Sequence, residues 1–162
     1  MFPKIKTYRC ILNCISNTDI PILQEIFDDE ATKYYLRELN ELVSSKDGIR
    51  QFLKSFSCYV NRNEGILWGI YLNSKLVGFI AIMDMPDNPT LFYAMHPDYR
   101  LQGIMKECII EATNFISKQT YCNFLQTEVY KDNDISINIL QSADFKIIDF
   151  NDNKVFLKTE FR

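Results

Sequence analysis

The sequence predicts an α/β (α+β) fold in which a mixed, mostly antiparallel central sheet is covered by helices on both faces. Three β-prone runs separated by short turns follow one another over residues 66–95. An amphipathic helical pattern follows at residues 103–118, and strand and helix patterns then alternate to residue 161. A chain of 162 residues can bury a substantial core, so we expect a single domain over residues 1–162.

The first predicted strand and helix lie near the start of the chain. Residues 8–15 alternate in polarity and are β-prone, which predicts a strand. Residues 16–19 carry side chains that cap helices, and Pro21 is tolerated in a first helical turn. We therefore expect a helix from there to about Phe27.

Residues 29–56 predict further helix, broken near residues 44–48. Many of these residues are polar, and Tyr34 and Tyr35 fit no apolar stripe, so a helical flap over a site is favoured over core. The acidic run at residues 28–30 could attract a cationic partner, but a solvated loop is the more common role.

Three strands and two turns are predicted in the middle of the chain. The strands cover residues 66–72, 75–83 and 90–95, and turns at residues 73–74 and 86–89 separate them. The first two strands form a hairpin and the third extends the meander. The large apolar side chains at strand spacing are expected in the core: Trp68, Phe79 and Phe92.

The last part of the chain predicts a helix, a strand, a short helix and a closing hairpin. The first helix covers residues 103–118, with one apolar face at spacings of three and four. A strand at residues 123–130 precedes a helix at residues 133–142. Two strands, at residues 145–150 and 154–161, close the fold.

Charge and hydropathy exclude several functions. A net charge of −3 and a pI near 5.2 argue against a nucleic-acid surface and suit a cationic or amine partner weakly. No apolar run approaches the roughly 20 residues of a membrane span, and the N-terminus lacks a signal-peptide core. We therefore expect a cytoplasmic protein with no membrane partner.

The cysteines and the one histidine predict neither disulfides nor a metal site. The five cysteines are odd in number, show no CxxC spacing and lie in apolar segments, which favours buried thiols in a reducing compartment. Because His96 is the only histidine, a Cys/His metal cluster is hard to build, and we expect no metal.

The motif most suggestive of chemistry lies at residues 93–105 (YAMHPDYRLQGIM). A strand there leads into a helix start, where successive backbone N–H groups and the helix dipole suit a pyrophosphate. Gly103 would allow close approach of the phosphates. Alone this pattern is weak, because most such junctions bind nothing. It matches neither a Walker loop nor a Rossmann fingerprint.

At this point the sequence resembles the GNAT acetyltransferases, whose coenzyme A loop follows Gln/Arg-x-x-Gly-x-Gly/Ala. Arg100 and Gly103 match, whereas Met105 stands where a small residue is usual. Met105 and the following Lys106-Glu107 resemble the Rim-type branch, which acetylates N-terminal amines of ribosomal proteins. The resemblance implies a GNAT-like sheet, acetyl-CoA as cofactor, and these cofactor-binding residues: Tyr93, Ala94, Met95, Arg100, Leu101, Gln102, Gly103, Ile104, Met105, Lys106 and Asn133.

A second resemblance follows downstream and extends the match to residues 66–161. The family often has a strand-end glutamate, then Asn-x-x-Ala/Ser, then Gly-Phe. Glu128, Asn133 and Ser136 match this pattern, whereas Asp144 replaces the glycine.

Amine acetylation needs a neutral amine, a stabilised oxyanion and a group that assists the departing thiolate. For the base the resemblance implies Glu128, although a solvated strand-end glutamate is an equal alternative. His96 is a rival base, but His-Pro at a strand end more often forms a turn. The resemblance places the oxyanion donor at the Met95 N–H.

Assistance to the thiolate is assigned to Ser136, to water or to nothing. Leu140 occupies the position where many family members carry a tyrosine. Ser136 as an ordinary helix-face hydroxyl is slightly favoured, and Asn133 could bind pantetheine amides, cap its helix, or do both. Glu107 and Glu111 are expected on the solvent face of their helix.

Taken together, these patterns predict an N-acetyltransferase that moves an acetyl group from acetyl-CoA to a primary amine, either a protein N-terminus or a small molecule. The alternative is a catalytically inactive GNAT-fold domain that binds acyl-CoA as a sensor or scaffold. We expect a monomer or a homodimer.

Overall fold

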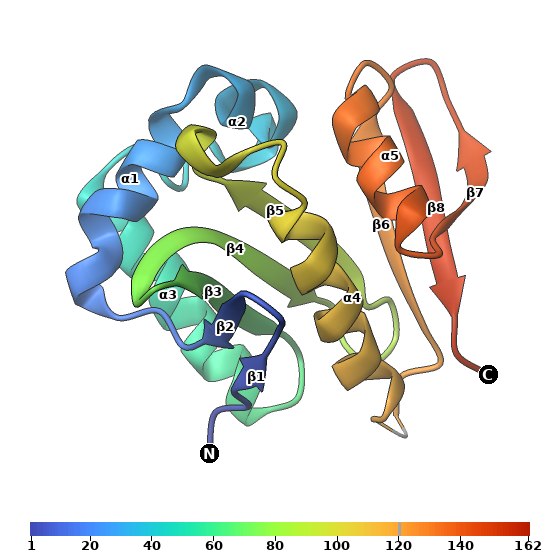
Figure 1. The fold of residues 1–162 in the computed structure, drawn as a ribbon, viewed down its shortest axis with the longest axis horizontal. Helices are drawn as coiled ribbons and strands as arrows, with labels where there is room; N and C mark the ends of the chain where they lie inside the picture. The colour runs from blue at the N-terminus through green and yellow to red at the C-terminus, as the bar shows by residue number, and fades with distance from the viewer. Residues whose placement is uncertain (120) are drawn as a thin grey trace.

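The computed structural model describes residues 1–119 and 121–162. They form an eight-stranded sheet in the order β1-β2-β3-β4-β5-β6-β8-β7, antiparallel at every junction of the described strands except β5–β6. The predicted fold class is confirmed (Figure 1). The strands are Ile5–Lys6 (β1), Cys10–Asn13 (β2), Ile66–Leu72 (β3), Lys75–Met83 (β4), Thr90–Met95 (β5), Phe124–Tyr130 (β6), Lys146–Phe150 (β7) and Lys154–Glu160 (β8).

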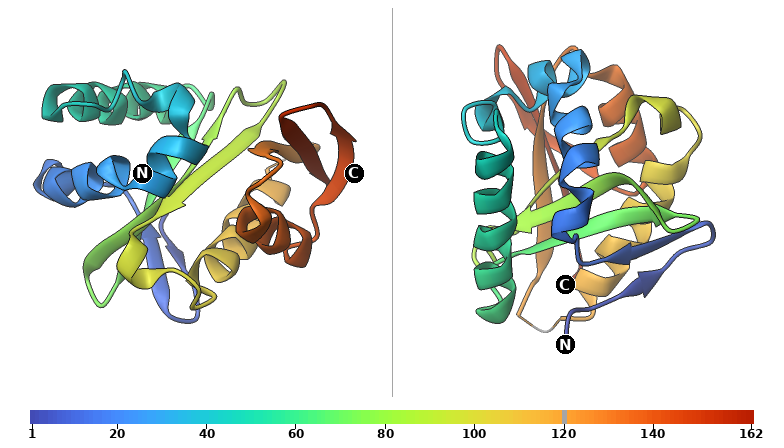
Figure 2. Two further views of the ribbon diagram at one scale, coloured as in Figure 1. Left: turned by 90° about the horizontal axis from the view of Figure 1, so that it is seen from above. Right: turned by 90° about the vertical axis from the view of Figure 1, so that its left-hand side faces the viewer.

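Helices cover both faces of the sheet (Figure 2). The helices α1 and α3 lie on one face, and α4 and α5 lie on the other. β4 is apolar along most of its length because both of its faces are buried: Phe79 belongs to the core under α1 and α3, and Ile80 to the core under α4. The helices are Ile20–Asp28 (α1), Glu30–Tyr35 (α2), Lys46–Asn61 (α3), Ile104–Ser117 (α4) and Asp134–Ser142 (α5).

The two parallel strands at the centre of the sheet part soon after they meet. In the described part of the chain, β5 and β6 are paired only at Thr90 and Gln126. The Thr127 hydroxyl still donates to Leu91 O at 2.8 Å, but no backbone pairing follows. β6 stays paired with β8 along its whole length and moves away from β5 after this rung. The edge of β5 that faces β6 is therefore left unpaired. A cleft therefore opens beside the second half of β5.

Most predicted elements match the structure closely, but the first strand does not, and α3, expected as part of the flap rather than core, packs Ile49, Phe52 and Phe56 into the core. The strands at residues 66–72, 75–83 and 90–95 have the predicted bounds. The strand expected at residues 8–15 is shorter, because Thr7 bonds back to Cys10 through its N–H and its hydroxyl, and the chain turns there. The residues before this turn form β1, which the sequence did not predict.

The cysteines are less uniformly buried than the sequence suggested. Cys10, Cys108 and Cys122 are buried, whereas Cys14 and Cys58 are exposed, so that part of the expectation is wrong. All five are free thiols. Among the described residues, no helix is long and apolar enough to cross a membrane, and no group of His, Cys, Asp and Glu side chains is arranged to hold a metal ion.

Candidate functional site

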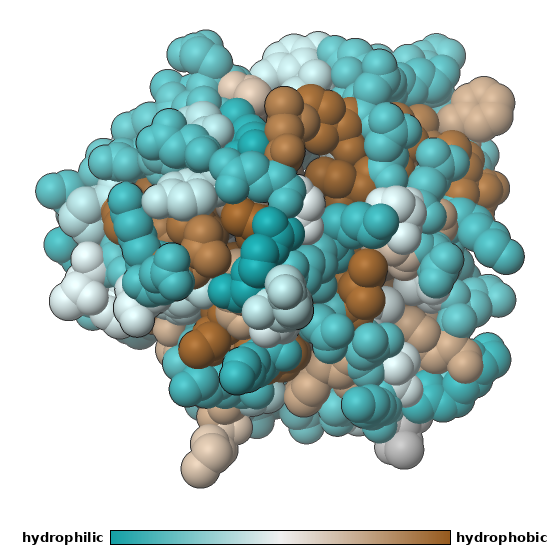
Figure 3. Space-filling model, viewed as in Figure 1, coloured by the Kyte–Doolittle hydropathy of each residue, from teal (hydrophilic) through white to brown (hydrophobic). Residues whose placement is uncertain are grey.

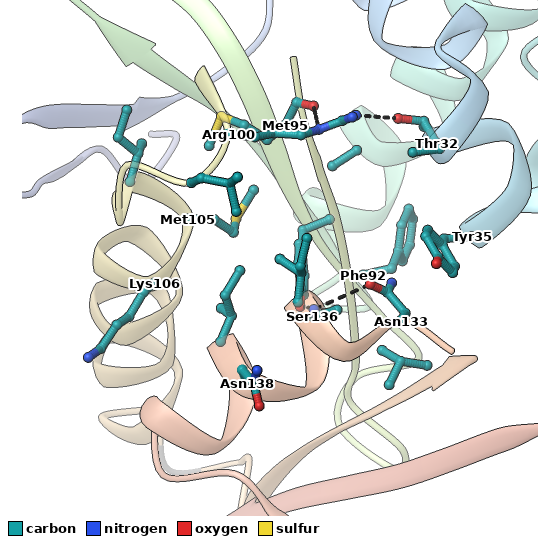
Figure 4. Close-up of a pocket in the computed structure, with 18 of the residues that line it drawn as sticks. Thr32, Tyr35, Phe92, Met95, Arg100, Met105, Lys106, Asn133, Ser136 and Asn138 are labelled. Carbon is teal, nitrogen blue, oxygen red and sulfur yellow. Dashed lines mark hydrogen bonds between the residues drawn. The ribbon is translucent and has the colours of Figure 1, made fainter. Parts of the chain in front are cut away.

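A cavity of about 500 Å³ lies where β5 and β6 separate. β5 and β6 form its base, the starts of α4 and α5 form its sides, and α2 lies over one end. In Figure 3 hydrophobic residues reach the surface between the regions of α2 and α5, and Figure 4 shows the residues around the cavity. The residues that the resemblance assigned to the cofactor, the base and the thiolate all line it: Tyr93, Ala94, Met95, Arg100, Leu101, Gln102, Gly103, Ile104, Met105, Lys106, Glu128, Asn133 and Ser136.

The loop before α4 exposes a run of unpaired backbone donors. Leu101 and Gly103 have positive φ angles of 62° and 77°, which turn the chain sharply into the helix. Within the described residues, the N–H groups of residues 101–106 have no hydrogen-bond partner in the protein, and the first bond of the helix runs from Glu107 N to Gly103 O at 3.2 Å. These donors and the positive end of the helix dipole favour an anion.

The free edge of β5 offers further donors to the same cavity. His96 N–H donates to Val77 O of the neighbouring strand at 2.8 Å. Because successive residues of a strand face opposite edges, Ala94 also faces β4, and Tyr93 and Met95 direct their N–H groups into the cleft. An extended ligand placed there can pair with the strand, with its anionic end toward residues 101–106.

The start of α4 is held in place from outside the cavity. The Glu107 carboxylate accepts hydrogen bonds from the Thr7 hydroxyl, from Arg9 N at 2.7 Å and from Arg9 Nε at 2.9 Å. Arg9 also donates to Gln102 O at 2.8 Å. Burial opposes ionisation of Glu107, but the bonds from Thr7 and Arg9 outweigh it and lower the pKa. The expectation that Glu107 lies on the solvent face is wrong, because the β1–β2 turn covers it.

Arg100 connects the loop before α4 to α2, the part of the expected flap that lies over the cavity (hereafter the flap). Its guanidinium donates to Met95 O at 3.1 Å and to the Thr32 hydroxyl at 3.2 Å (Figure 4). It also donates to Asp29 Oδ2 at 2.6 Å. Burial acts against the charge of Asp29, yet the bonds from Arg100 and Thr32 lower its pKa overall. Asp29 therefore caps α2 and anchors the flap, rather than lying in a solvated loop as expected.

The start of α5 is capped from within. Asn133 Oδ1 accepts from Ser136 N at 3.3 Å, and the Ser136 hydroxyl makes a short hydrogen bond with the Tyr93 hydroxyl across the cleft. Burial raises the pKa of Tyr93, against the opposing effect of the bond to Ser136. Leu140 is fully buried in the core and does not line the cavity.

Glu128 lies at the cavity wall on β6 but is already paired. Lys154 Nζ on β8 contacts Glu128 Oε1 at 2.8 Å and Glu38 Oε1 at 2.9 Å. The Tyr130 hydroxyl donates to Glu38, and Lys154 Nζ lies over the Tyr130 ring, 4.8 Å from its centroid. Partial burial disfavours the Lys154 charge, but Glu128 and Glu38 outweigh it and raise the pKa of Lys154. No local pattern predicts this pair, because Glu128 and Lys154 lie on different strands, 26 positions apart in the chain.

The rival base His96 lies outside the cavity lining. Its Nδ1 accepts from Asp98 N at 3.2 Å and caps the short helix Pro97–Tyr99, while Nε2 contacts Glu25 Oε2 at 3.0 Å. This is the turn role that His-Pro suggested. Both ring nitrogens are in use on the side of the strand end away from Ser136 and Glu128.

Several lining residues carried no sequence signal. For the residues of the flap, the sequence predicts a polar helix but not contact with the cavity. The lining residues on α5 could have been predicted from helical spacing, because they lie within about one turn of Ser136. The flap residues face Phe92, which is half-buried rather than a pure core side chain (Figure 4). The additional lining residues are Ala31, Thr32, Tyr35, Leu36, Phe92, Tyr99, Thr127, Val129, Ile135, Asn138 and Ile139.

Comparison with known proteins supports this picture. The chain matches the acetyltransferase (GNAT) domain family over residues 9–146. A search of curated proteins found no match.

Three of the similar solved structures are acetyltransferases of low identity, so they show the fold alone. A RimL ribosomal L7/L12 α-N-protein acetyltransferase in complex with coenzyme A has a TM-score of 0.86 at 12% identity, covering 98% of each chain. The ribosomal-protein-S5-alanine acetyltransferase from Vibrio fischeri has a TM-score of 0.77 at 12% identity, covering 98% of this chain and 96% of that one. The microcin C7 self-immunity acetyltransferase MccE, in complex with acetyl-CoA and AMP, has a TM-score of 0.76 at 9% identity, covering 94% and 93%. With its family match, its sheet and the loop before α4, the chain belongs to the acetyltransferase (GNAT) domain family.

Proposed function

We propose that residues 1–162 act as one domain that transfers an acetyl group from acetyl-CoA to a primary amine. The observation that carries this proposal is the run of unpaired N–H groups at residues 101–106 beside the free edge of β5. Family membership and the coenzyme A found in two similar structures support it.

The described residues fit the proposed cofactor. Six N–H donors at a helix start suit the pyrophosphate, and Gly103 allows the turn that presents them, because glycine adopts its φ of 77° without strain. Lys106 extends outward from the first turn of α4 and adds positive charge near the cavity mouth (Figure 4). The cleft-facing backbone of Tyr93, with Asn133 opposite, would bind the pantetheine amides.

The bound cofactor supplies a thioester whose acetyl carbon is open to attack by a neutral amine. We propose Glu128 as the base that takes the proton from the amine, directly or through one water. Lys154 holds one of its oxygens, and Glu38 offers that ammonium a second partner. An entering ammonium would therefore compete with Lys154 for Glu128, and Lys154 could turn toward Glu38.

Two further groups complete the proposed site. The Met95 N–H lies at the free edge of β5 and would stabilise the developing oxyanion. The Ser136 hydroxyl on α5 would assist the thiolate as it departs. Because both groups lie on regular elements rather than on loops, their positions are fixed by the sheet and by the α5 cap.

The acceptor is proposed to be a protein N-terminus or a small amine. The RimL and Vibrio fischeri enzymes are named for the acetylation of ribosomal proteins, and the acidic Glu128, Glu38 and Asp132 near the cavity suit a cationic amine. We place the protein in the cytoplasm as part of the proposal, since five free thiols suit a reducing compartment.

Calorimetric titration with acetyl-CoA, followed by assays of thiol release with mixed peptides and polyamines, tests the proposal. Binding together with turnover on any amine supports it, and absence of binding would contradict it.

A second function, an inactive acyl-CoA sensor, is favoured by two observations. Lys154 occupies the proposed base, and Leu140 replaces the family tyrosine with a buried side chain. Binding of acetyl-CoA without turnover on any amine would favour this sensor over the transferase.

A further inference from the structure

The Tyr93 side chain spans the cleft that the separation of β5 and β6 opens. It starts from β5, points to the face covered by α4 and α5, and ends in a short hydrogen bond with Ser136 of α5. Both residues line the cavity. No family motif quoted above assigns a role to a tyrosine side chain at this position.

The direction of this hydrogen bond follows from chemistry. A phenol is a stronger donor and a poorer acceptor than an aliphatic hydroxyl, so Tyr93 donates to Ser136 Oγ. Burial keeps the phenol protonated, because it raises the pKa of Tyr93. The donated hydrogen is therefore present throughout the physiological pH range.

Ser136 then has its own hydrogen to give. Hydroxyls within helices commonly donate to a backbone carbonyl one turn earlier. Among the described residues the Ser136 hydroxyl has no such bond, and Tyr93 is its one partner. Within the part of the chain that the structure describes, its hydrogen then has no acceptor in the protein, so it is available to a ligand in the cavity.

We propose that Tyr93 is a positioning residue, which donates to one lone pair of Ser136 Oγ and so orients the serine hydrogen toward the sulfur of coenzyme A. This inference rests on the proposed function. When the carbon–sulfur bond breaks, the electron pair goes to sulfur, and the Ser136 O–H donates a hydrogen bond to the thiolate without losing its proton. The proton that later completes the thiol comes from solvent.

The test uses coenzyme A bound to the full chain, with the ultraviolet absorbance of its thiolate followed against pH. A hydrogen bond to the thiolate favours the charged form, so the thiol pKa of bound coenzyme A should be lower than that of the free molecule. Ser136→Ala should raise it toward the free value. Tyr93→Phe removes only the phenolic oxygen. It should raise the thiol pKa of bound coenzyme A by a smaller amount than Ser136→Ala does, since the serine hydrogen is no longer oriented toward the sulfur.

Activity should follow the same order. Tyr93→Phe should lower kcat by about tenfold, as expected for one hydrogen bond, with affinity for coenzyme A unchanged. The double variant should behave like Ser136→Ala, because Tyr93 acts only through the serine. Tyr71→Phe is the matched control: it also removes a hydrogen-bonded phenol oxygen, partly buried and bonded to Asp19 at 2.8 Å, and should leave the thiol titration unchanged.

The outcomes separate this inference from the proposed function. A Tyr93→Phe protein that binds coenzyme A and titrates like the parent would overturn the positioning role, as would strictly additive effects in the double variant. An unchanged thiol titration in Ser136→Ala would also overturn the positioning role. If the parent protein still turns over, the proposed acetyl transfer is not affected by that result. Failure of the parent to bind coenzyme A would instead overturn the function on which the inference rests.

Discussion

Two helices begin at the same cavity, and their first turns are built in opposite ways. α4 begins after Gly103 without a capping side chain, and the described structure offers no partner for the donors of residues 101–106. α5 begins after Asn133, whose side chain accepts from the N–H of Ser136. Orphan donors at a helix start normally find a cap, so an uncapped start that faces a cavity indicates a site for an external anion.

The two starts are also held differently. α4 is fixed from behind by Glu107 and by Arg9, which leaves its donors free. α5 is fixed by its own cap and presents the Ser136 hydroxyl. The comparison suggests a division of roles: the α4 start binds the cofactor, and the α5 start with the neighbouring β6 serves the reaction. Changes at the first should alter affinity, and changes at the second should alter turnover.

The largest effect is expected from Gly103→Glu. A carboxylate beside the free donors would compete for them and repel the diphosphate, so affinity for acetyl-CoA should fall by more than about 100-fold in a calorimetric titration. Gly103→Ala is the control, because it carries the same strain of a positive φ, about 1–2 kcal/mol, without the charge. Equal affinities of the two variants would show that backbone strain, not anion binding, governs this turn.

Glu128→Gln should affect turnover, the role assigned to the α5 start and the neighbouring β6. Loss of the base should lower kcat by about 100-fold or more, while affinity for acetyl-CoA stays unchanged. Steady-state rates of thiol release, paired with cofactor titrations, measure both quantities. Lys154→Met is a useful companion, because it frees Glu128 without removing it and should not lower kcat to the same extent. A fully active Glu128→Gln protein would exclude this residue as the base.

Glu107→Gln tests whether α4 is held from behind. Loss of the charge-assisted bonds should destabilise the protein by about 2 kcal/mol at neutral pH. The pKa of Glu107 is lowered by folding, so its contribution is present above the pKa of about 4.5 for a free glutamate and is lost as pH falls through the lowered value. Denaturant unfolding should therefore show a difference that shrinks in acid. A difference that is constant with pH would contradict this assignment.

The smallest effect is expected from Asn133→Ala. Removal of the α5 cap should reduce the free energy of unfolding by about 1 kcal/mol. Asn133→Asp retains a cap acceptor and serves as the matched control. Because Asn133 is also proposed to bind the pantetheine, the affinity for acetyl-CoA should fall in Asn133→Ala by more than the loss of stability explains, and should not do so in Asn133→Asp. Thermal melts with and without acetyl-CoA measure both the stability and the affinity.

The sequence predicted the elements with local signals and missed the contacts between distant segments. The strands at residues 66–72, 75–83 and 90–95 carry their own periodicity and turns, so their bounds match. The strand at residues 8–15 was misjudged because the Thr7–Arg9 turn is stabilised by Glu107, about 100 positions away. Nothing near Glu107 in the sequence signals that turn.

The site shows the same limit. The residues named from the motifs line one cavity, because a motif that spans a strand, a loop and a helix is local; their roles stay predictions. The flap anchor between Arg100 and Asp29, the Lys154 contact with Glu128 and the Tyr93–Ser136 bond join segments far apart in the chain. Such pairs depend on sheet order, which periodicity does not encode.

The separation of β5 from β6 has a consequence for motion. With one rung at Thr90 and Gln126, strands β1–β5 and strands β6–β8 share little backbone bonding, so the last three strands should open as a unit of lower stability. A ligand paired with the free edge of β5 and with α5 would bridge the two sets. Hydrogen–deuterium exchange of amides in β6 should therefore slow when acetyl-CoA is added, and so should exchange in β8, although no residue of β8 lines the cavity.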